Sequence, residues 1–196
     1  MMRLSHLLPL MIISSFLFAG TDGTIRGKVT DVDGVLTDGT IYKGNEGAEF
    51  KRFSVLDGAG VALAHEAGMK VVIISGRYSP ATESRAKELG LEDDCYQGYL
   101  NKAALYEHLK EKYDFEDEEA VFIGDDLIDI EVMERVGLPI AVANAVAPVK
   151  SIAKLITEAN GGEGAFREAI EVILHSRGEY EATILSLRDK IRESKV

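Results

Sequence analysis

The stretch "TDVDGVLTDGT", residues 30–40, decides how the rest of the sequence is interpreted. Asp31 and Asp33 stand one residue apart at the end of "KVTDV" (28–32), a short run with the composition of a strand. Two carboxylates this close repel each other. They belong either to a turn that faces water or to a site for positive charge. The choice depends on what the remaining sequence brings to the same place.

From residue 28 onward, short apolar runs alternate with helical patterns. Strands are expected at 28–32, 70–75, 95–98, 120–124 and 139–142, and a short helix with a sixth strand within 145–157. A β-hairpin is expected at 40–53, because "GNEG" lies between β-forming residues. This alternation predicts an α/β fold: a Rossmann-like parallel sheet with helices on both faces and a hairpin after the first strand.

Helix boundaries follow from caps and glycines. One helix is expected at 58–68 with Asp57 as its N-cap and Gly68 as its stop. The other helices are expected from Ser79-Pro80 to Gly90, at 101–114, at 126–137, in 161–178 after a glycine loop, and in the charged tail 179–196.

Polar residues follow the strands, where parallel sheets bind ligands. Asp31 and Asp33 follow the first strand, and Ser75 closes the strand at 70–75. Lys102 opens the helix after "CYQG", and "DDLID" (125–129) follows "AVFIG". Each of these pieces alone is common in turns, but together they gather a hydroxyl, a lysine and two acidic clusters at one edge. The conjunction favours a site over a water-facing turn.

The chemistry of such a site follows from its charge. Clustered carboxylates need a cation or a raised pKa, and oxygen ligands without His or Cys point to Mg²⁺. A lysine and a small hydroxyl can hold a phosphoryl group. An aspartate can attack phosphorus to form an acyl-phosphate, and a second carboxylate two residues on can move the proton.

Four motifs resemble those of the haloacid-dehalogenase-like phosphatases: "DVDGVLTDG", "SGR", "QGYLNK" and "GDDLID", in the family's order across about 30–178. Within the family, "GNEGAEFKRF", "GRYSPATESRAKELG" and "GGEGAFRE" are similar to the capless 3-deoxy-D-manno-octulosonate 8-phosphate phosphatases. The resemblance implies a Mg²⁺-dependent phosphomonoesterase with an aspartyl-phosphate intermediate. It also implies release of the free sugar acid in lipopolysaccharide precursor synthesis, and a homotetramer whose neighbouring subunits help to cover each active site.

The resemblance assigns roles to residues that match its motifs. Asp31 would be the nucleophile and a metal ligand, and Asp33 the general acid/base with its backbone carbonyl on the metal. Asp125 would be the third metal ligand, while Ser75 and Lys102 would hold the phosphoryl group.

Further roles lie around this centre. Asp126 would orient Lys102 or a metal-bound water, with Asp129 in support. Substrate contacts are expected from Asp33, Asp57, Gly58, Arg77, Arg85 and Lys102. Thr37 and Asp38 would support the loop that leads into the hairpin.

Two positions depart from the subgroup. Leu56 and Ala62 stand where it has arginines, so cationic contacts to a sugar carboxylate are lost. A related nonulosonate 9-phosphate, or another small sugar phosphate, is therefore an alternative substrate.

Other classes of protein fit this sequence less well. A calcium loop that starts at Asp31 fails, because Val35, Leu36 and Tyr42 fall where the pattern needs Asp or Asn, Gly and Glu. A signalling receiver also uses an aspartate that accepts a phosphoryl group, but it has no second carboxylate beside that aspartate. The presence of Asp33 therefore favours a phosphatase over a receiver. A family member that has become a non-enzymatic assembly protein remains an alternative.

Composition bounds the setting of the protein. The chain has 196 residues and a net charge of −11, which argues against binding to nucleic acid. Cys95 is the only cysteine, so no disulfide can form within the chain.

The two ends of the chain are expected to differ from the domain at 28–178. Residues 1–27 form a signal-like segment or an unstructured extension, or they follow from a start codon placed too early; a membrane is a partner only if the segment is a real signal or anchor. A phosphatase of a cytoplasmic sugar-phosphate pathway needs no export, so a cytoplasmic location is expected. The tail 179–196 either packs on its own domain or reaches a neighbour's active site.

Overall fold

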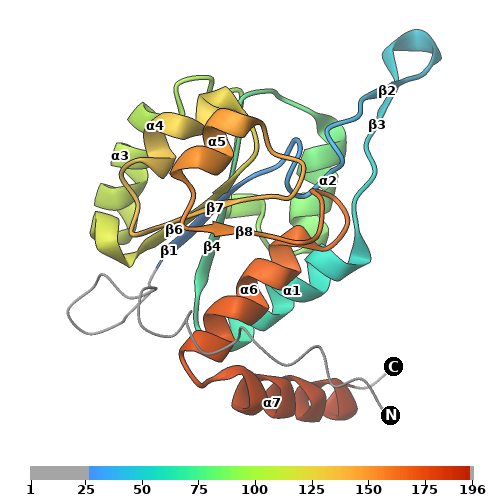
Figure 1. Cartoon of the computed structure of the whole chain (residues 1–196). Coiled ribbons are helices and arrows are strands. Elements are labelled where there is room, and N and C mark those ends of the chain that lie inside the picture. Colours follow the sequence, from blue (N-terminus) through green and yellow to red (C-terminus); the bar gives the residue numbers. More distant parts are fainter. Residues whose placement is uncertain (1–26, 195–196) are drawn as a thin grey trace, which may run out of the picture.

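The computed structural model describes residues 27–194 and has a six-stranded parallel sheet as its centre (Figure 1). The strand order is β5-β4-β1-β6-β7-β8. The strands are β1 (Gly27–Asp31), β4 (Lys70–Ser75), β5 (Cys95–Gln97), β6 (Ala120–Gly124), β7 (Leu138–Ala141) and β8 (Leu155–Ile156). The predicted α/β fold and its six strands are confirmed. The segment before residue 27, with its expected signal or extension, lies outside the described residues.

Helices cover both faces of the sheet, as predicted. One face carries α1 (Val55–Glu66) and α6 (Ala165–Ser176), which pack on each other, and the other carries α3 (Lys102–Tyr113), α4 (Ile130–Met133) and α5 (Ala147–Ile152) (Figure 1). The remaining helices are α2 (Pro80–Glu88) and α7 (Tyr180–Glu193). Short 3-10 turns occupy Asn45–Gly47, Glu92–Asp94, Asp117–Glu119 and Leu127–Asp129.

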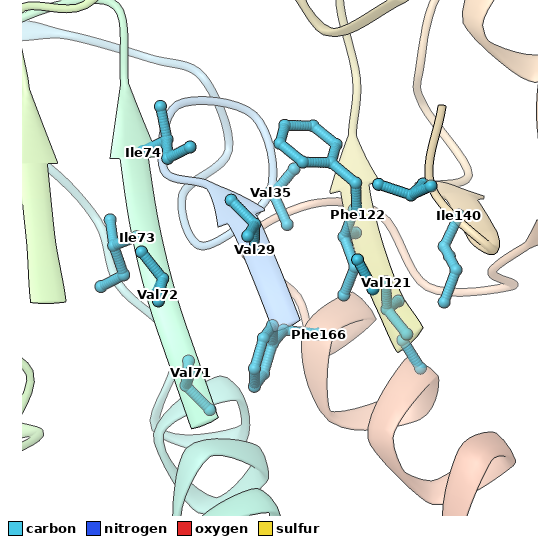
Figure 2. Close-up of a cluster of buried hydrophobic side chains, with 14 of the residues drawn as sticks. Val29, Val35, Val71, Val72, Ile73, Ile74, Val121, Phe122, Ile140 and Phe166 are labelled. Carbon is cyan, nitrogen blue, oxygen red and sulfur yellow. The ribbon is translucent and has the colours of Figure 1, made fainter. Parts of the chain in front are cut away.

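The core explains why the central strands read as unbroken apolar runs. Residues 71–74 of β4 and 120–123 of β6 are buried on both sides of the sheet, as expected for parallel strands under two helix layers. Figure 2 shows Val29 of β1 between these strands, with Phe166 of α6 packed below. This frame holds the carboxyl ends of β1, β4 and β6 in register.

The predicted hairpin is present as two short strands, β2 (Tyr42–Lys43) and β3 (Glu49–Phe50), which pair antiparallel. It extends away from the sheet at the end opposite α7 (Figure 1). The returning strand β3 contacts α2, and Lys51, which follows β3, pairs with Asp33 in the loop after β1.

Helix α1 begins earlier than the sequence predicted. The expected start at residue 58 with Asp57 as N-cap is wrong, because Ser54 caps the helix and its side chain accepts a hydrogen bond from the backbone N–H of Leu56 (3.1 Å). Gly60 does not interrupt the helix. A Cβ there would lie 2.8 Å from the Cα of Arg167, so glycine permits the close approach of α1 and α6.

Asp57 instead joins α1 to the start of α6. It is 2% exposed, and its carboxylate accepts hydrogen bonds from the backbone N–H groups of Gly164 (3.3 Å), Phe166 (3.0 Å) and Arg167 (3.4 Å). These are first-turn N–H groups that have no partner within their own helix. Asp57 is thus the cap of a helix more than a hundred residues further along the chain.

The helix expected at 126–137 is also shorter than predicted. A 3-10 turn at Leu127–Asp129 leads into the single turn of α4, which ends at Met133. Gly137 has left the helix by then. Its N–H donates to the backbone carbonyl of Asp117, and a Cβ there would lie 2.3 Å from the carbonyl oxygen of Glu118.

The C-terminal tail forms α7, which packs on α1 of its own chain. Glu66 accepts hydrogen bonds from Ser186 (2.5 Å) and from Lys190 (2.7 Å). Tyr180, Ile184 and Leu187 add apolar contacts with the core. Within residues 27–194, no helix combines the length and the apolar composition needed to cross a lipid bilayer.

We expect Asp57→Ala to lower the free energy of unfolding by about 1–2 kcal/mol at pH 5, because three N–H groups of α6 lose their acceptor. The loss should be smaller at pH 7.5. Burial, opposed by these hydrogen bonds, raises the pKa of Asp57 from 3.8 to about 6. The stability from its protonation is therefore complete below pH 4 and lost as the pH rises through 6. Urea unfolding at both pH values measures the difference.

The control is Asp189→Ala, which removes an exposed carboxylate of α7 and should cost less than about 0.5 kcal/mol at either pH. Equal losses in the two variants would contradict the role of Asp57 as the cap of α6.

Candidate active site

The loop after β1 places the two aspartates of the opening motif. The backbone carbonyl of Val32 accepts three N–H groups, from Val35 (3.3 Å), Leu36 (3.0 Å) and Thr37 (3.0 Å). The hydroxyl of Thr37 accepts from the N–H of Gly34 and donates to the same carbonyl. The chain therefore turns tightly around Val32, and Thr37 supports the loop as predicted.

Two glycines allow other segments to reach this loop. A Cβ at Gly34 would lie 2.0 Å from Oδ2 of Asp125, which follows β6. A Cβ at Gly161 would lie 1.7 Å from the carbonyl oxygen of Gly34, and the N–H of Gly162 donates to the carbonyl of Val35 (2.8 Å). The loop before α6 thus rests directly on the loop after β1.

Asp31 lies in a buried charge network. It is 3% exposed, and its Oδ2 is 2.7 Å from Nζ of Lys102, whose side chain is fully buried at the start of α3. The same Nζ donates to Oδ1 of Asp129 (2.6 Å). Burial lowers the pKa of Lys102, but the two carboxylates outweigh burial and leave that pKa above its usual value. The ammonium therefore stays charged between two anions.

Asp125 completes the acidic cluster. Oxygens of Asp31, Asp125 and Asp129 lie within 4.8 Å of one another. Burial, together with the charges of Asp31 and then Asp129, raises the pKa of Asp125 to about 8. Burial also raises the pKa of Asp31 to about 7, against the opposing effect of Lys102. One lysine does not neutralise three carboxylates.

This cluster fits a divalent cation. Oδ1 of Asp125 is buried and has no hydrogen-bond partner among the described residues. Both oxygens of Asp129 are engaged, since Oδ1 accepts from Lys102 and Oδ2 accepts from the N–H groups of Asp125 and Asp126. Each oxygen of Asp31 accepts one hydrogen bond, from the N–H of Val32 (2.7 Å) or from Lys102, and so keeps a second lone pair. Asp31 and Asp125 can therefore offer lone pairs to a hard cation.

Asp33 lies next to the cluster with both oxygens held. Its Oδ2 accepts from the hydroxyl of Ser75 (3.3 Å), at the end of β4, and its Oδ1 is 2.6 Å from Nζ of Lys51. Ser75 is fully buried, and its one hydroxyl hydrogen is shared between Asp33 and the backbone carbonyl of Arg77, which is nearer (2.8 Å). The structure thus brings Asp33 and Ser75 together, as the sequence predicted, and adds Lys51.

The two predicted arginines are engaged with carboxylates of the same chain. Arg77 donates to both oxygens of Glu49 in β3, and this pairing holds the pKa of Glu49 below its usual range. Arg85 pairs with Glu88 (2.9 Å), and a Cβ at Gly58 would lie 2.6 Å from its Nη2. Gly58 therefore makes room for Arg85.

Two other sequence-based assignments differ from the observed positions. Asp57 was expected at the substrate, but it is buried between α1 and α6 and bonded to backbone N–H groups. Asp126 was expected to orient Lys102 or a metal-bound water; in the structure its carboxylate accepts from the N–H of Leu127 and begins the 3-10 turn. Asp129 makes the contact with Lys102 instead, because it lies three residues further along that turn.

Sequence reasoning missed Lys51 and Glu49. Both stand in the predicted hairpin, two residues apart, so they share one face of an extended chain. That spacing was the available signal. Their contacts with Asp33 and Arg77 depend on how the hairpin returns over the sheet edge, which no local pattern encodes.

Comparison with known proteins identifies relatives. Residues 94–168 match the family of haloacid dehalogenase-like hydrolases. The 3-deoxy-D-manno-octulosonate 8-phosphate phosphatase of Escherichia coli K12 is 43% identical over 157 residues, which cover 80% of this chain and 83% of the relative.

Solved structures agree with this result. The Yersinia pestis 3-deoxy-D-manno-octulosonate 8-phosphate phosphatase superposes with a TM-score of 0.78 and 41% identity, covering 80% of this chain and 84% of the other. The Moraxella catarrhalis enzyme, in complex with a magnesium ion, a phosphate ion and a KDO molecule, gives a TM-score of 0.79 at 36% identity and covers 83% and 92%. The chain therefore belongs to the haloacid-dehalogenase-like hydrolases, in the group of phosphoric monoester hydrolases that these relatives represent.

Proposed function

We propose that this protein hydrolyses 3-deoxy-D-manno-octulosonate 8-phosphate to the free sugar acid and phosphate, in the synthesis of lipopolysaccharide precursors. The observation that carries the proposal is the buried contact of Asp31 with Lys102 at the carboxyl end of β1 (2.7 Å). A carboxylate fixed beside an ammonium in a water-poor site is arranged to attack phosphorus, because the lysine also attracts the phosphoryl oxygens. The names of the relatives support the choice of substrate.

The proposed reaction has two steps on this chain's own residues. In the first, an Asp31 oxygen forms a bond to phosphorus while the bond to the sugar oxygen breaks and Asp33 gives that oxygen a proton. In the second, Asp33 takes a proton from water as the water oxygen attacks phosphorus and the bond to Asp31 breaks. Lys102 and Ser75 would hold the phosphoryl oxygens throughout, and Asp129 keeps Lys102 in place.

We infer Mg²⁺ as the cofactor, held by Asp31, Asp125 and the backbone carbonyl of Asp33. When bound, it would offset the negative charge that builds up on the transferred phosphoryl group. The partnerless oxygen of Asp125 and the magnesium ion in the Moraxella catarrhalis relative support this inference.

The identity of the sugar rests on fewer residues than the phosphatase chemistry does. Leu56 is 48% exposed at the start of α1, where its subgroup has a cation, and Arg77 is paired with Glu49. A related nonulosonate 9-phosphate is the second candidate, since a substrate carboxylate would have to compete with Glu49 for Arg77. All residues needed for the chemistry are present, so we place a non-enzymatic assembly role behind both.

We also infer a homotetramer and a cytoplasmic location. The hairpin exposes Tyr42 (49%) and Phe50 (63%), which gives copies of the chain an apolar surface to share. Sugar phosphates of biosynthetic pathways are handled inside the cell, and this supports the location.

A substrate screen tests the proposed function. Released phosphate is measured with Mg²⁺ across 3-deoxy-octulosonate 8-phosphate, a nonulosonate 9-phosphate, and hexose 6-phosphates. We expect kcat/KM for the octulosonate to exceed that for the hexose phosphates by at least about tenfold, since only the sugar acids offer a carboxylate to the arginines. A clear preference for hexose phosphates would overturn the assignment of a sugar-acid substrate.

The nucleophile is tested by Asp31→Asn. An amide cannot form the acyl-phosphate, so we expect kcat to fall by at least about 10³-fold while the protein stays folded. The matched control is Asp38→Asn, an aspartate of the same loop that bonds Arg52 at the surface and should stay within about threefold of the wild type. Turnover that survives in Asp31→Asn would exclude Asp31 as the nucleophile.

Metal removal should make stability depend on pH. Burial raises the pKa of Asp31 to about 7 and that of Asp125 to about 8, both from 3.8. In EDTA, the stability due to their protons is complete at low pH and lost as the pH rises through 7–8. Mg²⁺ should therefore raise Tm more at pH 8.5 than at pH 6. At a Mg²⁺ concentration 100-fold above Kd, the rise in Tm should be roughly 5–10 °C.

Differential scanning fluorimetry measures this shift, with NaCl at equal ionic strength as the control. Asp125→Asn removes one ligand and should abolish most of the Mg²⁺ effect. An equal shift at both pH values would contradict binding to the ionised cluster.

A further inference from the structure

Lys51 is a buried lysine outside the cluster around Asp31. It directly follows β3, and its side chain is 0% exposed although the hairpin beside it projects into solvent. Its Nζ is 2.6 Å from Oδ1 of Asp33 and 3.1 Å from the hydroxyl of Thr82 in the first turn of α2. The ammonium therefore spans from the loop after β1 to α2.

Stability alone explains this arrangement poorly. A buried ion pair loses in desolvation much of what it gains in attraction, so an apolar residue at position 51 would serve the packing as well. A lysine also loses more side-chain entropy on burial than most residues do. The burial of Lys51 is therefore better explained by its effect on Asp33.

The partner is held at both ends. Lys51 binds Oδ1 of Asp33 at 2.6 Å, whereas the one hydroxyl hydrogen of Ser75 is shared between Oδ2 (3.3 Å) and the nearer backbone carbonyl of Arg77 (2.8 Å), so Lys51 is the stronger of the two contacts. The carboxylate plane of Asp33 is thereby fixed, although this side chain is 32% exposed and stands on a loop. Without Lys51, a single bond to Ser75 would remain, and the carboxylate would be free to turn toward water.

We propose that Lys51 is a positioning residue that holds the carboxylate of Asp33 in the orientation for proton transfer. This inference rests on the proposed function, because it assumes that Asp33 moves protons there. In the first step, Asp33 transfers its proton to the leaving sugar oxygen as that oxygen separates from phosphorus. In the second step, it takes one proton from the attacking water. Lys51 itself exchanges no proton and contacts no reacting atom.

The position of Lys51 also places proton transfer under the control of the hairpin. Glu49 lies two residues earlier and binds Arg77. The strand β3 and the residue after it thus contact both Asp33 and a candidate substrate arginine. A shift of the hairpin would disturb the two together.

The first test is a double-mutant cycle of Lys51→Met and Asp33→Asn. General acid–base catalysis accelerates a reaction by about 10²–10⁴-fold, and a misplaced Asp33 carboxylate would lose part of that acceleration. We expect Lys51→Met to lower kcat by about 10–100-fold with KM within about threefold. In the double variant, kcat should match that of Asp33→Asn alone, because Lys51 acts through Asp33.

The leaving group provides an independent readout. An alkyl phosphate needs its leaving oxygen protonated, whereas p-nitrophenyl phosphate does not. Lys51→Met should therefore lose about tenfold more kcat with the alkyl phosphate. A purely structural defect would lower kcat for both substrates alike.

Lys43→Met is the matched control. Lys43 is the other lysine of the hairpin; its side chain is 62% exposed and pairs with Glu49, so kcat should change less than about threefold. If Lys51→Met does not fold, Lys51→Gln, which keeps a donor but no charge, takes its place in the same cycle.

Four results would overturn the inference. Additive losses in the cycle, or a large rise in KM, would mean that Lys51 contacts the substrate rather than Asp33. Wild-type kcat in Lys51→Met, with Asp33→Asn impaired, would remove the inference and leave the proposed function standing. A wild-type protein that hydrolyses no phosphomonoester with Mg²⁺ would remove both.

Discussion

The site depends on one buried ammonium, that of Lys102. It lies between Asp31 and Asp129 at 2.7 and 2.6 Å, with no exposure to solvent. Three carboxylates packed into the end of a hydrophobic sheet would otherwise repel each other and unfold the loops that carry them. The lysine offsets part of that charge, and the remainder explains the raised pKa values of Asp31 and Asp125. The same imbalance makes the site a binding place for a cation.

Glycines decide how close the segments come. Gly34 admits the carboxylate of Asp125, and Gly124 admits the side chain of Asp129, whose Cβ would lie 2.7 Å from an added Cβ. Gly161 lets the loop before α6 touch the loop after β1. A side chain at Gly34 or Gly124 would push a carboxylate outward, and one at Gly161 would push the two loops apart. Close packing and charge balance are therefore linked here.

The sequence was sufficient for the sheet and for the cluster, because both follow local rules. Continuous apolar runs marked the buried strands, and residues after each strand had to meet at one edge. It was insufficient where contacts join distant segments. Asp57 was expected to cap its own helix but caps α6. A lysine in a hairpin is expected at the surface, but Lys51 is buried and binds Asp33. Asp126 and Asp129 could not be distinguished before the 3-10 turn fixed their directions. The role of the tail also needed the structure, which packs α7 on α1.

The contact of Gly161 with Gly34 has a consequence for the order of synthesis. A ribosome that has made Asp31 must still add the whole of β4, β6 and β7 before the glycine loop emerges. At about 5–20 residues per second, the acidic loop therefore remains uncovered for roughly ten seconds. Early in that interval its carboxylates also lack Lys102 and Asp125, and until the end of the interval they lack the covering loop. The nascent chain thus carries Asp31 early, but the site around it is complete only when part of the C-terminal third has been made.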